Sequence, residues 1–75
     1  MKKTVGQHMY EARQKSGLTA YELAKRANLY ANTIYSWETD KALPTLLNVA
    51  SAATVLGLSI NEYCGIPIPE RKNSD

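Results

Sequence analysis

Residues 18–38 read LTAYELAKRANLYANTIYSWE, and they contain two short amphipathic segments separated by a turn. Thr19 and Glu22 have the spacing of a capping box, in which each side chain satisfies a free backbone N–H of the other residue, so a helix is predicted to start here. Asn28 tolerates positive φ and predicts the turn that ends this helix. The apolar stripe of this helix consists of Leu23, Ala24 and Ala27.

The second segment, from Ala31 to Glu38, predicts a helix about 12 Å long, which spans about three or four base pairs of DNA. Ile34 and Trp37 are three residues apart and are expected to face inward. The outer face then carries short or polar side chains: Ala31, Asn32, Thr33, Tyr35 and Ser36. Such side chains permit close approach to base edges in the major groove. The two segments therefore predict a DNA-reading helix-turn-helix, against the alternative of an ordinary solvated polar face.

A wider set of positions carries a family resemblance. These positions are Arg13, Gly17, Leu18, Thr19, Glu22, Leu23, Ala24, Ile34, Trp37, Glu38, Lys41, Pro44, Ala53, Leu56, Gly57, Leu58 and Tyr63. Together they resemble the Cro/CI-type (XRE family) helix-turn-helix domains of phage repressors and small bacterial regulators, over about residues 5 to 64. The resemblance implies an all-α, compact five-helix, lambda-repressor-like domain whose second and third helices form the helix-turn-helix, followed by a short extended C-terminal tail.

The resemblance also implies roles for individual residues. The positions that align with base-reading residues are Ala31, Asn32, Tyr35 and Ser36. The positions expected to contact phosphates are Thr19, Tyr30, Thr33 and Lys41. In such domains Arg13 forms a buried ion pair with Glu38, whereas from the residues alone the two could be unrelated surface charges.

Four positions depart from the family pattern, of which Asn28, in place of the turn Gly, is tolerable. Ala20 replaces a Gln that reaches the DNA, so that contact is expected to be absent. Asp40 replaces a Gly and brings a negative charge close to the predicted phosphate surface, beside Lys41. Tyr30 replaces the usual Ser or Thr helix cap, and its ring is expected either to reach a phosphate or to pack over Leu29.

The remaining helices follow from periodicity and caps. The first is predicted from Val5 to Ser16, ending at Gly17. Its inner side is expected to consist of Val5, Met9, Ala12 and Ser16. The fourth is predicted from near Thr45 to Leu56, and a short fifth from Ser59 to Cys64, opened by a second capping box with Glu62. The core positions expected on the fourth helix are Leu46, Val49, Ala53 and Leu56.

The chain is predicted to hold one domain, residues 1–65, and an extended or flexible tail, residues 66–75, because the prolines of Ile66-Pro67-Ile68-Pro69 disfavour helix. The tail either covers the core of its own subunit or contributes to a homodimer. The residues expected at a dimer interface are Leu47, Ile60, Ile66 and Ile68. We expect a homodimer, because one helix specifies too few base pairs for a unique site.

Composition limits the alternatives. The net charge is only +2, but residues 1–41 carry +3 and the rest −1, so the positive excess lies in the half that holds the predicted DNA-reading helix. A single His and the single Cys64, expected to be a packed thiol, form no recognisable metal site, and we expect no cofactor. Neither a membrane span nor a secretory signal is evident, so a cytoplasmic protein is expected.

These features predict a DNA-binding transcription regulator, a repressor that inserts its third helix into the major groove of a palindromic operator as a homodimer. No motif for acid–base or nucleophilic catalysis is evident, so an enzyme is not expected. The alternative is a protein-interaction module, such as an antitoxin or an adaptor of the transcription machinery, with weak DNA binding. Double-stranded DNA and a second copy are the expected partners, and a different protein is a further candidate.

Overall fold

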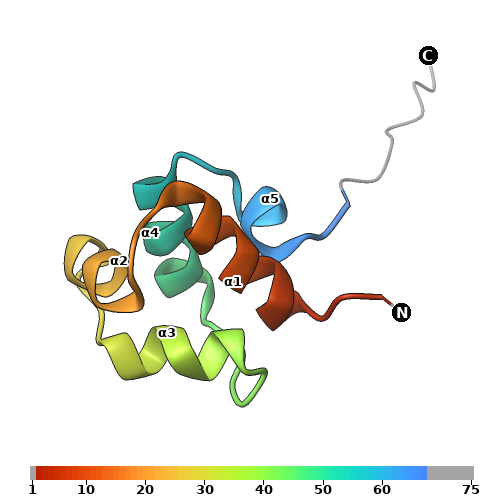
Figure 1. The fold of residues 1–75 in the computed structure, drawn as a ribbon, viewed down its shortest axis with the longest axis horizontal. Helices are drawn as coiled ribbons and strands as arrows, with labels where there is room; N and C mark the ends of the chain where they lie inside the picture. Colours follow the sequence, from red (N-terminus) through yellow and green to blue (C-terminus); the bar gives the residue numbers. More distant parts are fainter. Residues whose placement is uncertain (1, 68–75) are drawn as a thin grey trace.

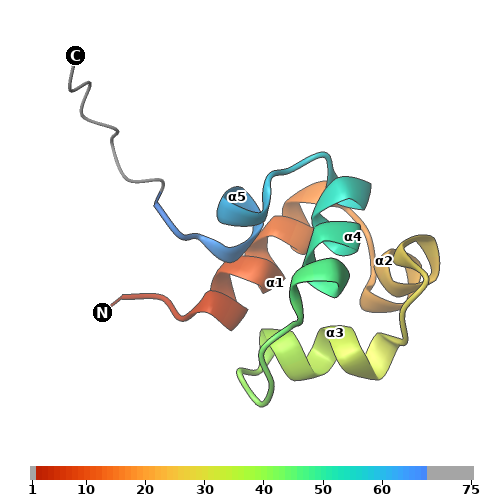
Figure 2. The same cartoon turned by 180° about the vertical axis from the view of Figure 1, so that it is seen from behind.

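Five helices make up the part of the chain that the structure describes. The computed structural model describes residues 2–67, in which α1 spans Val5–Ser16, α2 Ala20–Ala27, α3 Ala31–Glu38, α4 Leu46–Leu56 and α5 Ile60–Cys64. In Figure 1, α3 runs along the lower side of the bundle with α2 beside its start, and α4 lies behind α1. Figure 2 shows the reverse side, with α4 in front. The predicted all-α five-helix fold is confirmed.

Side-chain caps explain where α1, α2 and α5 begin, and left-handed residues explain where every helix except α3 ends. The predicted capping boxes at Thr19 and Ser59 are both present, and a third, unpredicted box at Thr4 opens α1. Gly17 ends α1 with φ 75°, and Asn28 ends α2 with φ 61°. Apart from glycine, Asn and Asp are the residues that adopt such positive φ values most readily. The predicted helix bounds therefore have local chemical causes.

All five helices contribute buried side chains to the core, in which α1 packs against α3, α4 and α5, and α2 packs against α3 and α4. The largest fully buried side chains are Met9, Leu23, Ile34 and Tyr63. Smaller residues on α2 and α4 allow these two helices to approach closely: Ala20, Ala24, Ala27, Ala52 and Ala53. Cys64 is a buried free thiol, as predicted, and burial raises its pKa.

Two expected core positions were wrong. Leu46 is 70% exposed, because it is the first residue of α4 and side chains of a helix tilt toward its N-terminus, here past the end of the core. Ala52, six residues further on, is fully buried instead. Ser16 is exposed at the end of α1, and its hydroxyl donates to the carbonyl of Ala12 at 3.1 Å, so it satisfies its own helix.

The predicted tail is only partly described. Ile66 and Pro67 are exposed and belong to no helix, whereas Ile68, predicted at a dimer interface, lies outside the described residues. Within residues 2–67, none of the helices combines the length and apolar character needed to cross a membrane.

Candidate nucleic-acid interface

The pair α2–α3 is held in place by a cap at its start and a turn at its centre. The Thr19 hydroxyl accepts from the backbone N–H of Glu22 at 3.0 Å, and the Glu22 carboxylate accepts from the backbone N–H of Thr19 at 2.8 Å. These hydrogen bonds, that of the Thr19 backbone first, lower the pKa of Glu22. At the turn, the N–H of Leu29 donates to the carbonyl of Ala24 at 2.7 Å, which fixes the direction of the chain into α3.

The two faces of α3 differ sharply in burial. Ile34, Trp37 and Glu38 are buried against the rest of the domain. The predicted base-reading residues are accessible on the remaining surface, with Asn32 and Tyr35 exposed and Ala31 and Ser36 half-buried. Because none of these four side chains carries a charge, the accessible surface of α3 presents hydrogen-bonding and apolar groups of the kind that base edges accept.

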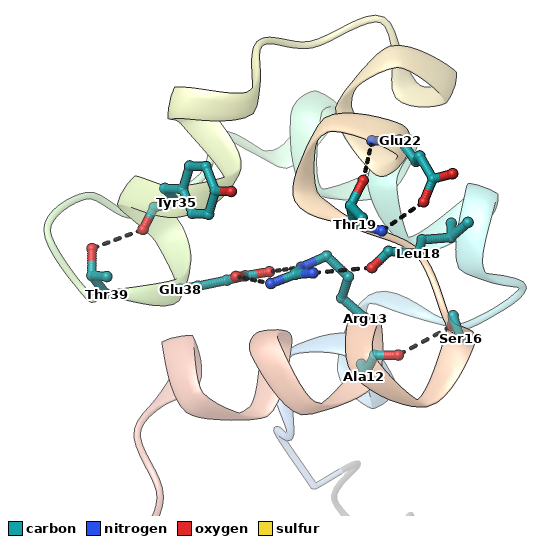
Figure 3. Close-up of polar contacts among 9 residues, drawn as sticks. All are labelled: Ala12, Arg13, Ser16, Leu18, Thr19, Glu22, Tyr35, Glu38 and Thr39. Carbon is teal, nitrogen blue, oxygen red and sulfur yellow. Dashed lines mark hydrogen bonds and ion pairs between the residues drawn. The ribbon is translucent and has the colours of Figure 1, made fainter.

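A buried ion pair fixes α3 against α1. The Arg13 guanidinium donates from Nε to Glu38 Oε2 at 2.7 Å and from Nη2 to Glu38 Oε1 at 2.9 Å, and the two side chains are only 8% and 4% exposed. The Nη1 group donates to the carbonyl of Leu18 at 3.0 Å (Figure 3). The Cζ atom of Arg13 lies 5.3 Å from the centroid of the Tyr10 ring. The Glu38 hydrogen bond raises the pKa of Arg13. The expected pair is therefore present and joins α1, the α1–α2 connection and α3.

The predicted phosphate-contacting residues belong to the start of α2, to α3 and to the residues on either side of α3. Tyr30 immediately precedes α3 and makes no cap; at 82% exposed, its ring does not pack over Leu29 to any large extent. Thr33 is half-buried, and Lys41 is exposed in the loop that follows α3. At Thr19, the cap uses the oxygen of the hydroxyl and not its hydrogen.

The loop after α3 is organised by backbone carbonyls at the end of the helix. The Thr39 hydroxyl donates to the carbonyl of Tyr35 at 2.7 Å (Figure 3), and the N–H of Lys41 donates to the carbonyl of Ser36 at 2.9 Å. Lys41 is thus bound through its backbone to the same helix that carries the predicted base-reading residues.

Sequence reasoning missed two features of this surface. Tyr21 is exposed on α2 and, with Lys25, Tyr30 and Ala31, lines a hollow of about 200 Å³ beside the start of α3. The spacing of Tyr21 and Lys25, four residues apart, was the available signal for a shared helix face. The sequence predicts an unfavourable charge at Asp40, but its carboxylate accepts hydrogen bonds from Thr4 and Gly6 at the start of α1. Ala20, at the position where the family has a Gln, is fully buried.

The fold and this surface define a DNA-binding domain of the helix-turn-helix class. A model of the helix-turn-helix family matches residues 9–63, more than half of the chain, and the chain therefore belongs to this family, in its Cro/CI-like (XRE) form. The family is one of DNA-binding transcription regulators. No curated protein matches the chain.

Proposed function

We propose that the protein is a sequence-specific repressor that binds an approximately palindromic operator as a homodimer, with α3 in the major groove. The observation that carries this proposal is the uncharged, accessible face of α3, backed by the buried Arg13–Glu38 ion pair. A helix whose inner face is fixed in this way presents its outer side chains with little freedom, which sequence discrimination requires.

Asn32 is the principal base-reading residue in this proposal, because an amide side chain pairs with N6 and N7 of adenine. Ala31 lies against a thymine methyl, Ser36 donates to or accepts from a base edge, and Tyr35 contacts a base edge or the backbone. The phosphate contacts come from Thr19, Tyr30, Thr33 and Lys41. They supply affinity without sequence preference.

Selection of bound sequences from a random DNA pool would reveal the operator, and variants then separate the two kinds of contact. We expect Asn32→Ala to relax specificity at one position at a cost of about 1–3 kcal/mol, and Lys41→Ala to weaken binding to all sequences and lower the salt slope by about one. Fluorescence anisotropy at several salt concentrations measures both. Equal losses of Asn32→Ala on operator and on random DNA would contradict its role.

The homodimer would be formed by apolar residues outside α3. Leu47 is 80% exposed and Ile66 is also exposed, while Ile60 is half-buried against its own core. With Ile68 these are the residues proposed at the interface. Leu43 and Leu46, both exposed beside Leu47 in the sequence, add apolar surface of the same kind. A dimer on its operator would block access of other proteins to that DNA, which is the basis of the proposed repression.

The same exposed leucines favour a second candidate, a protein-interaction module in which the domain binds a different protein and DNA only weakly. Large exposed apolar patches mark protein interaction sites. Salt-dependent binding to the selected operator in the presence of competitor DNA separates the two functions. An interaction module would bind all sequences weakly and alike.

A further inference from the structure

Asp40 connects two parts of the protein that are far apart in sequence. It follows α3 by two residues, with φ 61°, and its carboxylate reaches the start of α1. Asp40 Oδ2 accepts from the hydroxyl of Thr4 at 2.6 Å, and Oδ1 accepts from the backbone N–H of Gly6 at 3.0 Å. Both carboxylate oxygens therefore accept hydrogen bonds at the start of α1.

The start of α1 has a shape that accommodates this carboxylate. Gly6 is buried, and a Cβ at this position would lie 2.5 Å from the carbonyl oxygen of Trp37 and 2.8 Å from Asp40 Oδ1. Only glycine permits this approach without displacing the end of α3. The Thr4 hydroxyl donates to Asp40 while it accepts from the N–H of Gln7 at 3.1 Å, so the cap of α1 and the contact with Asp40 share one side chain.

We infer that Asp40 is a positioning residue for DNA binding: it fixes the loop after α3 on α1 and thereby holds Lys41 where it meets a phosphate. Lys41 follows Asp40 directly, and its own N–H is bound to the carbonyl of Ser36 at 2.9 Å. This inference rests on the proposed function in one respect, the phosphate contact of Lys41. It does not require Asp40 itself to touch DNA.

Electrostatics and positioning predict opposite effects, which makes the inference testable. A carboxylate close to phosphates repels them, so its removal alone should tighten binding. Asp40→Asn and Asp40→Gly make the same change in charge, and both residues tolerate φ near 61°. The Asn side chain keeps an oxygen that can accept from Gly6, whereas Gly keeps none.

We expect Asp40→Gly to bind the selected operator about tenfold more weakly than Asp40→Asn, with a salt slope lower by about one, because the phosphate contact of Lys41 is lost. Adding Lys41→Ala to Asp40→Gly should then cause no further loss. Equal affinities of the two Asp40 variants, or a full additional loss on adding Lys41→Ala, would overturn the inference.

A second pair of variants approaches the same contact from α1. Thr4→Ala and Ser59→Ala each remove a helix cap, but only Thr4 donates to Asp40. We expect Thr4→Ala to lower operator affinity about fivefold at a temperature where circular dichroism shows both variants folded, and Ser59→Ala to leave it unchanged. If Thr4→Ala and Ser59→Ala changed operator affinity equally, Thr4 and Asp40 would contribute only to stability, and the inference would be rejected.

Hydrogen exchange of the free protein separates failure of this inference from failure of the proposed function. The N–H of Lys41 should exchange about tenfold faster in Asp40→Gly than in Asp40→Asn, whether or not DNA is bound by the wild type. If the N–H of Lys41 exchanges faster in Asp40→Gly but the wild type does not bind the operator, the proposed function is rejected. Asp40 would then still be the residue that orders the loop. Unchanged exchange rates would reject the inference.

Discussion

All three guanidinium nitrogens of Arg13 donate hydrogen bonds. Two of them meet the two oxygens of Glu38, and the third meets the carbonyl of Leu18, so the planar guanidinium is fixed in one orientation. A lysine carries a single ammonium group and could not reproduce this arrangement. The hydrogen bonds also compensate for burying two charges, a cost that would otherwise oppose folding. Arg13 thus fixes one of the contacts by which α1 and α3 meet.

Removal of either partner should therefore be costly. We expect Arg13→Met and Glu38→Gln each to lower the free energy of unfolding by about 3–5 kcal/mol, because the remaining group stays buried without its partner. Denaturant unfolding monitored by circular dichroism measures the loss. The exposed Lys3–Glu11 pair provides the control, since Lys3→Ala should have little effect. Losses below about half a kcal/mol for the buried pair would show that the ion pair is not what holds α1 on α3.

At the scale of elements, local signals in the sequence were enough to predict most helix bounds. Gly17, Asn28 and Gly57 end three helices with positive φ, and Ser59 starts the last one with its predicted cap. These features act within a few residues of chain, so periodicity and turn chemistry reveal them. The Thr4–Gln7 capping box has the same local character, and it was available to sequence reasoning but missed.

Contacts between distant elements were harder to predict. The periodicity that correctly placed Val49 and Ala53 also placed Leu46 in the core, because it contains no information on where neighbouring helices end. The hydrogen bond from Gly6 to Asp40 joins residues 34 positions apart, and neither local sequence predicts it. The Arg13–Glu38 pair spans 25 residues and was expected only through the family resemblance. The geometry of the interface therefore depends on tertiary contacts that local patterns leave open.

Two buried groups on α5, Tyr63 and Cys64, predict that the fold loses stability at alkaline pH. Tyr63 is fully buried, its hydroxyl has no hydrogen-bond partner among the described residues, and burial raises its pKa. Burial likewise raises the pKa of the neighbouring Cys64. In the unfolded chain these groups ionise near pH 10 and 8.5. Above about pH 8.5 the unfolded state therefore binds fewer protons than the folded state, and stability must fall as pH rises.

Two substitutions test this pH dependence. Tyr63→Phe combined with Cys64→Ala should reduce the loss of stability between about pH 8 and 10.5, measured by urea unfolding at each pH. At pH 7, Tyr63→Phe alone should leave stability unchanged or raise it by about 1 kcal/mol, because no hydrogen bond is lost. Tyr21→Phe is the control, because Tyr21 is exposed. The stability of this variant should depend on pH as that of the wild type does. If the double variant lost as much stability between about pH 8 and 10.5 as the wild type, Tyr63 and Cys64 would not be the cause of the pH dependence.

For the whole molecule, the length of α3 limits what one subunit can specify. Eight residues of helix extend about 12 Å, which covers about three or four base pairs. Two copies related by a two-fold axis would place their α3 helices about 34 Å apart, in successive major grooves on one side of the DNA. A two-fold interface brings the same surface of both copies together, and the exposed side chains of Leu43, Leu46 and Leu47 offer apolar area for such a contact.

We therefore expect the protein to form a dimer at high micromolar concentration or on its operator, and Leu47→Glu to prevent it. The substitution places two like charges across the two-fold axis, where burial makes their repulsion and desolvation costly. Sedimentation velocity of the free protein and of its complex with the selected operator measures the state. Gln14→Glu adds the same charge on the exposed side of α1 and should leave dimerisation unchanged. A wild-type protein that stays monomeric both free and on the operator would reject the homodimer, and the operator would then be bound one subunit at a time.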